Sequence, residues 1–443
     1  MLSVIRDQTL FGATTTLWVL FALAAYLDPT SAAPQPIFAN GLSRRADAPG
    51  IGVEIEIGSI VIQGKERLEG EKREKVKGAL MEPVGFASGP KNNWKLTVDV
   101  GTSGVYPEAI VDGLKNKVGG GKTKAIGEEI FKFFNGWAPC AAKNCEVKIA
   151  GADSLGPWNV KWPKDTPPNL NTDVFSTQVT AAMPLQAVLK ILSDIKTKTK
   201  NPLASPGALD GPRIVIATKN SFKTFPKIKA SDINDEFLGF FSLLTSYCVL
   251  ADASVPNEGP KRIIPIMPRT DFLTQYNKFI EPKLTAQLAD KTVSLYDIVE
   301  AVSGKVDPTD KLAKSKFKWA TGRILDIADD WEGKREDMKA GTLEVGKFLN
   351  HLQGYNKATK KVVPKKDLVK LMDKTMRFNQ IGALGSKMET ILGTSKEVPI
   401  FEFRELKKVS GPNLGKELGL YEDMVIAYHK QFAKRSFDDE ESQ

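Results

Sequence analysis

Apolar and polar residues alternate over residues 52–58, which read Gly-Val-Glu-Ile-Glu-Ile-Gly. This period of two predicts a β-strand in which the three aliphatic side chains share one face and Glu54 and Glu56 share the other. The two carboxylates then lie roughly 6–7 Å apart, at a rise of about 3.3 Å per residue. Two interpretations stay open at this point: a strand with one face in solvent, or a pair of carboxylates that faces a cation.

The same patterns predict the other elements of the chain. Further strands are expected at 59–63, 94–100, 175–182 and 399–406, and helices at 125–136, 184–195, 232–251, 271–290, 310–356 in at least two pieces, 365–391 and 418–433. The proline-rich stretch 157–168 is expected to be irregular. Short strands separated by long helical segments predict an α+β fold, with a mixed or antiparallel sheet covered by helices and a largely helical C-terminal half. No repeat and no dividing linker is apparent, so 46–435 is predicted to be a single domain.

The two ends of the chain differ from this central part. Residues 1–33 place Arg6 before the apolar run 17–27 and the small residues that follow it, which is the order of a secretory signal peptide, with a signal anchor as the alternative. The Arg44–Arg45 pair predicts a propeptide over 34–45, unless it is an ordinary exposed pair. We therefore expect a secreted, extracellular protein with no membrane span in the mature chain. The acidic tail 436–443 is expected to be disordered.

The composition limits which disulfides, metal sites and acid–base groups the chain can form. Three cysteines among 443 residues are too few for a disulfide scaffold, although Cys140 and Cys145 are close enough in sequence to bridge in an oxidising compartment. Cys248 lies in an apolar run and is interpreted as a buried hydrophobic residue. The only histidines, His351 and His429, leave little for a histidine-rich metal site, so acid–base work would fall to carboxylates.

The net charge of +9 comes from lysines spread along the whole chain. Because no basic block is interleaved with stacking aromatic residues, nucleic-acid binding is not expected. A lysine-rich solvated surface, or attraction to acidic surfaces, fits this distribution better.

Other carboxylates fall at comparable strand positions. Asp99 ends the second alternating strand, Glu108 follows it, and Glu402 and Arg404 share one face of the late strand. Magnesium is usually held by carboxylates together with substrate phosphates, and an arginine neutralises charge that develops on a phosphoryl group. The alternative is that each strand is merely half exposed.

Two segments raise the question of further phosphate contacts. Residues 118–123, Val-Gly-Gly-Gly-Lys-Thr, end like a phosphate-binding loop, but Asn116 stands where such a loop needs glycine. Lys122 belongs to a glycine loop that could still lie over a phosphate. Arg269 ends an extended segment that leads into a helix, where Thr270 or Asp271 could cap and the arginine could point into a cleft. Structural entry to the helix is the alternative for that segment, and 378–385 is interpreted as core.

In chain order, these pieces resemble the amidoligases, carboxylate–amine ligases similar to glutamine synthetase. The resemblance rests on Gly52-x-Glu54-x-Glu56, on the strand that ends in Asp99, on the segment that contains Glu108, and on the Glu402-x-Arg404 strand. Gln178, in the strand before the helix at 184, stands where the family often has histidine; an amide is a poor magnesium ligand and no general base.

The resemblance implies a glutamine synthetase-like catalytic fold that uses Mg²⁺ and ATP to join a carboxylate to an amine through an acyl phosphate. The implied metal ligands are Glu54, Glu56, Asp99 and Glu108, the candidate catalytic residues are Arg404, Glu402 and Gln178, and the candidate cofactor contacts are Arg404, Arg269 and Lys122. Extracellular fluid holds little ATP, so such an enzyme would have to be delivered into another cell, as toxins and effectors are. The competing hypothesis is a non-catalytic secreted effector or toxin-like protein that binds a host protein with the same fold.

Overall fold

The computed structural model describes residues 48–440 apart from gaps at 66–67, 69–71, 73–74, 102–103, 163–168, 205–213, 252–264, 285–293, 305–310, 318–321, 327–333, 339–343, 354, 357–360, 363–386 and 405. The predicted signal peptide and propeptide and the segment 378–385 lie outside the described residues. Within the described residues, we find no helix that combines the length and the apolar character needed to cross a membrane.

A large antiparallel sheet forms the centre of the molecule, and the α+β class predicted from the sequence is confirmed. Its main path runs β14-β15-β8-β1-β5-β2-β7-β6-β3, while β16 pairs with β8, β4 with β5 and β9 with β15. The strand bounds along this path are Met388–Thr390, Glu397–Phe403, Asp173–Ala182, Ile51–Ile57, Gly104–Val111, Val61–Gln63, Trp158–Lys161, Glu146–Ile149 and Met81–Pro83; β16 is Val409–Ser410, β4 is Trp94–Gly101 and β9 is Ile266–Pro268.

The far end of this sheet curls back on itself. The Gly78 N–H donates to the carbonyl of Val98 at 2.8 Å, and the Val98 N–H donates to the carbonyl of Ala79 at 3.0 Å. These bonds join the segment just before β3 to β4, so β4, β5, β2, β7, β6 and the segment that leads into β3 close into a ring. The segment that leads into β3 is therefore bonded to β4, which partly covers an edge that would otherwise invite pairing with another chain.

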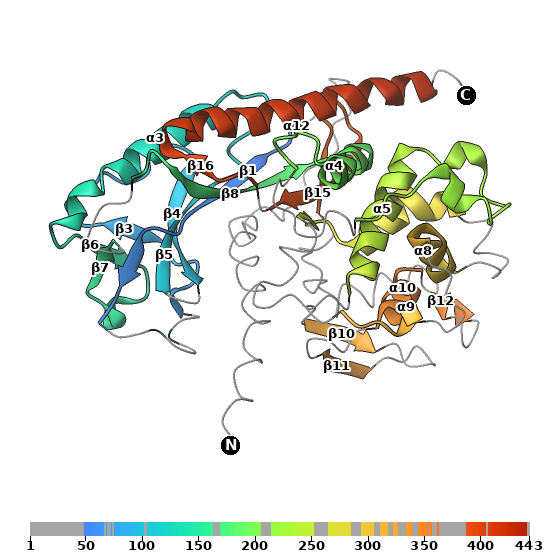
Figure 1. The fold of residues 1–443 in the computed structure, drawn as a ribbon, viewed down its shortest axis with the longest axis horizontal. Helices are drawn as coiled ribbons and strands as arrows, with labels where there is room; N and C mark the ends of the chain where they lie inside the picture. Colours follow the sequence, from blue (N-terminus) through green and yellow to red (C-terminus); the bar gives the residue numbers. More distant parts are fainter. Residues whose placement is uncertain are drawn as a thin grey trace, which may run out of the picture.

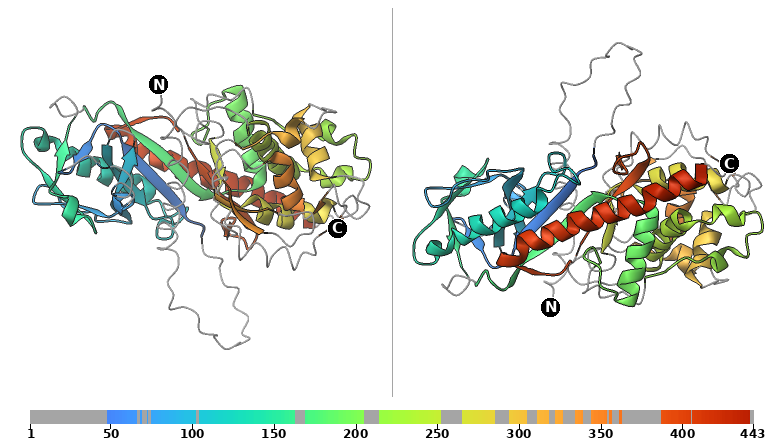
Figure 2. Two further views of the ribbon diagram at one scale, coloured as in Figure 1. Left: turned by 90° about the horizontal axis from the view of Figure 1, so that it is seen from below. Right: turned by 90° about the horizontal axis from the view of Figure 1, so that it is seen from above.

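Helices α3 (Thr123–Asn135), α4 (Leu185–Thr197) and α12 (Gly411–Glu440) lie along one face of the sheet (Figures 1 and 2). The Phe134 ring of α3 lies 6.4 Å from that of Phe175 in β8, and the Tyr421 hydroxyl of α12 hydrogen-bonds the Thr177 hydroxyl at 2.9 Å. Because alternate residues of a strand face opposite sides, the helices cover the face that carries the aliphatic residues of β1. These residues are buried, as the alternation predicts.

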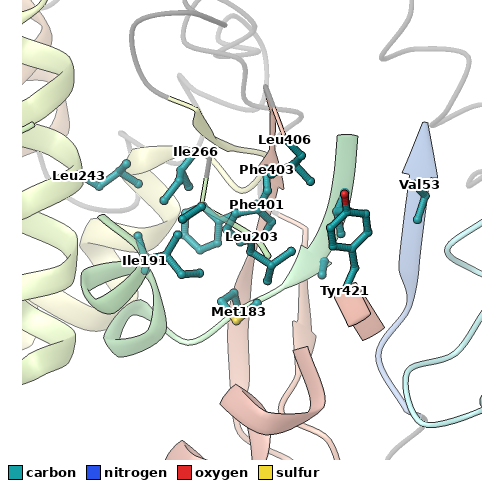
Figure 3. Packing of buried hydrophobic residues seen from close by; sticks show 14 of the residues in the cluster. Val53, Met183, Ile191, Leu203, Leu243, Ile266, Phe401, Phe403, Leu406 and Tyr421 are labelled. Carbon is teal, nitrogen blue, oxygen red and sulfur yellow. The ribbon is translucent and has the colours of Figure 1, made fainter. Parts of the chain in front are cut away.

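A second group of helices packs beyond the β15 end of the sheet (Figure 1). It contains α5 (Asp235–Val249), α6 (Phe272–Gln275), η8 (Tyr276–Ile280), α8 (Leu295–Ser303), α9 (Lys311–Lys314) and α10 (Val345–Gln353). Figure 3 shows Leu243 of α5 and Ile191 of α4 beside Ile266 of β9 and Phe401 of β15, all buried. The two parts of the molecule therefore share one hydrophobic core.

A disulfide bond between Cys140 and Cys145, which their short spacing in the sequence makes possible, lies between helix α3 and strand β6. Cys140 lies in the short helix η1 (Ala138–Ala141), just after α3, and is bonded to Cys145, immediately before β6. Cys248 is a free, fully buried thiol in α5, as predicted.

Several predicted boundaries differ from the structure. Strand β7 lies within the stretch predicted to be irregular, because Pro157 precedes the strand and does not occupy its ladder. Two strands, β10 (Gly322–Asp326) and β11 (Lys334–Met338), lie where 310–356 was predicted to be helical. The two strands pair antiparallel, with Gly322 opposite Met338 and Asp326 opposite Lys334. Helix α12 extends through Glu440, into the segment predicted to be a disordered tail.

His429 of α12 ties the helix layer to the sheet. Its Nδ1 accepts a hydrogen bond from the Leu392 N–H at 2.9 Å, and its Nε2 lies 2.8 Å from the carbonyl oxygen of Ala182. Because Nδ1 accepts, the proton of the neutral ring must be on Nε2, where it donates to Ala182. The ring is fully buried, and burial lowers the pKa of His429.

We expect this histidine to make the protein less stable in mild acid. Its folded-state pKa lies below the unfolded value of about 6.5, so its contribution is complete above that pH and is lost as the pH falls through the folded-state pKa. The loss is about 1.4 kcal/mol for each unit by which the pKa is lowered. Urea unfolding of wild type and of His429→Gln across this range measures it: the variant should show the shallower decline, and equal slopes would contradict the assignment.

Candidate functional site

The uncovered face of the central strands carries a row of polar side chains. In the pairing of β1 with β5, Glu54 lies opposite Ile110 and Glu56 opposite Glu108. In the pairing of β1 with β8, Glu54 lies opposite Gln178. Paired residues of an antiparallel ladder project from the same face, so these three glutamates and Gln178 share one side of the sheet.

Register extends this polar face in both directions. On one side, Thr97 of β4 lies opposite Glu108, and Asp99 follows two residues later on the same face. On the other, Glu402 of β15 lies opposite Thr180, two residues from Gln178. Met267 of β9 also lies opposite Glu402. Arg404 follows Glu402 by two residues, and Arg269 follows Met267 by two residues, so both arginines lie on the same face as Glu402.

Most of the residues singled out from the sequence therefore come together on one face. They are Glu54, Glu56, Asp99, Glu108, Gln178, Arg269, Glu402 and Arg404. We call this set the polar face.

Carboxylates crowd one half of the polar face. Glu108 is only 3% exposed, and its pKa is raised well above the usual value, first by burial and then by the negative charges of Glu54, Asp99 and Glu56. The Thr97 hydroxyl lies 3.1 Å from Glu108 Oε2. Since like charges this close repel, this half of the face favours a bound cation or proton.

The other half of the polar face is basic. The fully buried carboxylate of Glu402 forms ion pairs with both Arg269 and Arg404, whose side chains are only 8% and 6% exposed. Burial and then the charge of Arg404 lower the pKa of Arg269 to about 9. Two guanidinium groups gather around this one carboxylate, so this half of the face favours an anion.

The two halves meet at Glu54. Its charge raises the pKa of Glu108, which disfavours a further negative charge, and it also raises the pKa of Arg269, which favours the positive one. One half-buried carboxylate thus lies within electrostatic reach of both clusters. The arrangement can hold a cation and an anion side by side.

Backbone pairing fixes the two arginines. The Arg269 N–H donates to the carbonyl of Ile400 at 2.8 Å, and the Arg404 N–H donates to the carbonyl of Pro265 at 2.7 Å. The buried hydroxyl of Tyr247 in α5 donates to the carbonyl of Ile266, the first residue of β9, at 3.0 Å. Burial raises the pKa of Tyr247, and the charges of the two arginines lower it, so this ring lies near both.

Sequence reasoning did not single out Thr97 or Tyr247. Thr97 stands at an alternating position of a predicted strand, two residues before Asp99, so its side of the strand could have been inferred. Tyr247 lies in an apolar run, which gives no signal beyond burial.

Lys122 differs from the other predicted residues. It is exposed and immediately precedes α3, a helix of the opposite face, and strand register does not place it on the polar face. The N–H groups of Gly119 and Gly121 donate to Oε1 of Glu422 in α12, at 2.9 and 3.1 Å. Both glycines have positive φ, at 81° and 66°, which other residues rarely adopt. In this structure the glycine loop thus binds an internal carboxylate of α12.

The donor atoms of the acidic half suit a hard cation. Within the described part of the chain, no group of three or more histidine, cysteine, aspartate or glutamate side chains is arranged to hold a metal ion. Magnesium, however, is usually bound through one or two carboxylates, with waters and substrate phosphates completing its octahedron. The crowded carboxylates around Glu108 therefore fit this mode of binding, and no four-ligand protein cage is needed.

Comparison with known proteins adds little to this picture. No family model and no curated protein matches the sequence. One solved structure with a likeness to the chain is described as a Vibrio cholerae toxin from the MARTX/VgrG family; it is 10% identical, covers 83% of this chain and 97% of that chain, and has a TM-score of 0.34. Likeness at this level assigns neither a fold nor an activity.

Proposed function

We propose that the protein is an ATP- and magnesium-dependent ligase of the amidoligase type, with its site on the polar face. The observation that carries this proposal is the meeting of a carboxylate cluster and a buried arginine cluster at Glu54. Mg-ATP presents a divalent cation beside a chain of phosphates, so it needs adjoining acidic and basic groups of this kind.

In this proposal, the acidic half holds the cation. Glu54 and Glu56 extend from β1 at the centre of the sheet, Glu108 extends from its neighbour β5, and Asp99 extends from β4, on the other side of β5. A bound cation would offset the repulsion that raises the pKa of Glu108. A rigid central strand is well suited to hold ligands in place, since its backbone is paired on both sides.

The basic half would bind phosphate. Arg404 and Arg269 are held by backbone pairing and by Glu402, so their charges need little reorganisation when an anion arrives. Bound Mg-ATP would supply a phosphoryl group to an oxygen of the carboxylate substrate, with ADP as the leaving group; the amine would then displace phosphate from the activated carboxylate and lose a proton. The polar face would orient these groups and stabilise the charge on the transferring phosphoryl group.

The competing candidate is a non-catalytic secreted effector or toxin-like binding protein with the same fold. It shares the polar face but predicts no ATP turnover. Binding and turnover must therefore be measured separately.

Calorimetry with Mg-ATP tests the proposed site. We expect wild type to bind Mg-ATP and the double variant Glu54→Gln with Glu56→Gln, which keeps side-chain volume, to lose affinity tenfold or more, about 1.4 kcal/mol or above. The matched control is Glu82→Gln with Glu146→Gln, two exposed strand glutamates outside the polar face.

The outcomes separate the candidates. If wild type fails to bind Mg-ATP, or the double variant binds like the control, the ligase proposal is lost. Release of ADP in the presence of carboxylates and hydroxylamine, a general amine nucleophile, would support the ligase. Tight binding with no release of ADP would favour the non-catalytic candidate.

A further inference from the structure

Gln178 contains an unsatisfied oxygen at the centre of the polar face. Its side chain projects from β8, between the carboxylates of β1 and the arginine cluster that includes β15. The amide Nε2 donates to Glu56 Oε1 at 2.7 Å. Its Oε1 is buried and has no hydrogen-bond partner in the described part of the chain.

The hydrogen bond to Glu56 fixes the orientation of this amide. An ionised carboxylate only accepts hydrogen bonds, so Glu56 selects the NH₂ group of Gln178. Rotating the amide by half a turn would direct its oxygen at a carboxylate oxygen, which is repulsive. The orientation in the structure is therefore the favoured one, and Oε1 must find its partner elsewhere.

A buried carbonyl oxygen without a donor costs about 1–3 kcal/mol, so its presence suggests a ligand. The ligand must bring either a hydrogen-bond donor or a cation. Glu54 is the register partner of Gln178 and Glu56 accepts its NH₂ group, so both carboxylates lie on the same face as this amide. A cation satisfies all three groups together, whereas a neutral donor satisfies the amide alone.

We propose that the amide oxygen of Gln178 is a ligand of the cation held by Glu54 and Glu56, and that it makes the site select hard cations over transition-metal ions. This inference rests on the proposed cation site. Glutamine carbonyl groups are weaker ligands than carboxylates, which is why the sequence alone gave this residue little weight.

Selectivity follows from the kind of donor atom. Carboxylate and carbonyl oxygens suit Mg²⁺ and Ca²⁺, while an imidazole nitrogen favours Co²⁺, Ni²⁺ and Zn²⁺. A histidine at this position would therefore broaden the site toward transition metals. Glutamine keeps the donor set all-oxygen, so Gln178 would determine cation specificity as well as affinity.

Calorimetric titration of the full chain with MgCl₂ alone and with CoCl₂ alone tests the inference. Gln178→Met removes the oxygen at similar volume and should weaken Mg²⁺ binding by about fivefold, or about 1 kcal/mol. Gln178→His should raise the ratio of Co²⁺ to Mg²⁺ affinity at least tenfold. The control Gln63→His places the same imidazole at an exposed strand position and should leave the ratio as in wild type. Thermal unfolding checks that each variant is folded.

The result separates this inference from the proposed function. If wild type binds Mg²⁺, the Glu54 and Glu56 double variant does not, and both Gln178 variants keep the wild-type affinities, the amide oxygen is not a ligand and only the inference fails. If wild type binds neither ion, the cation site itself is absent and the proposed function fails with it. A Co²⁺ to Mg²⁺ ratio that rises only in Gln178→His supports the inference.

Discussion

Replacing Glu402 with alanine is expected to destabilise the protein by about 3–5 kcal/mol. The wild-type carboxylate is fully buried between Arg269 and Arg404 and balances one of their two charges. Without it, two guanidinium groups remain in a place where burial already lowers the pKa of Arg269. Removing one partner of a buried ion cluster costs more than the cluster contributes, because the charges left behind are uncompensated. Denaturant unfolding of wild type and variant measures the loss.

Glu397→Ala provides the control on the same strand. Glu397 also forms an ion pair, with Lys278, but the two side chains are 46% and 40% exposed. Exposed pairs contribute only about 0–1 kcal/mol, so this variant should stay close to wild type. Similar losses for both variants would mean that burial does not set the strength of the Glu402 cluster, and the description of the basic half would need revision.

Gly239→Ala is expected to destabilise the protein by about 2 kcal/mol, the opposite of what helix propensity predicts. Gly239 lies inside α5, where alanine is favoured over glycine by about 1 kcal/mol. However, a Cβ atom at this position would overlap the backbone carbonyl oxygen of Leu185 at the start of α4. Backbone cannot rotate away as a side chain can, so α4 and α5 must separate. Overpacking of this kind costs about 1–3 kcal/mol or more.

The matched control for this prediction is Gly419→Ala in α12. A Cβ atom there would meet Lys124 Cβ at 3.4 Å, which is an ordinary contact. Propensity should then dominate, and the variant should gain about 0.5–1 kcal/mol. A stabilising effect at both positions, measured by thermal unfolding, would show that α4 and α5 are not packed as closely as described.

Short-range patterns predicted the central strands well. Strand β1 is the clearest case, because Val53, Ile55 and Ile57 are buried on one face and the glutamates between them are half exposed on the other. The same period of two located β4, β8 and β15 within a few residues. These strands carry most of the candidate site, so its residues could be named before their arrangement was known.

Long-range pairing could not be predicted in this way. Glu56 lies beside both Glu108 and Gln178 because of the register between strands that are far apart in the chain. Glu56 and Gln178, for example, are 122 positions apart. The closed ring depends on short strands such as β6 and β7, which have too few residues to show a clear period. Lys122 illustrates the converse: its glycine-rich context suggests phosphate, but the structure places the Glu422 carboxylate on that loop.

The distribution of the polar face along the chain has a consequence for biosynthesis. Its side chains come from β1 near the start of the described residues, from β8 in their first half and from β15 close to their end. Strand β15 pairs with β8, which in turn pairs with β1, so the arginine side of the face forms only after β15 has been synthesised. Contacts of such long sequence separation form slowly. A nascent chain, still threaded through the ribosome, would have the carboxylates in place well before it could bind an anion beside them.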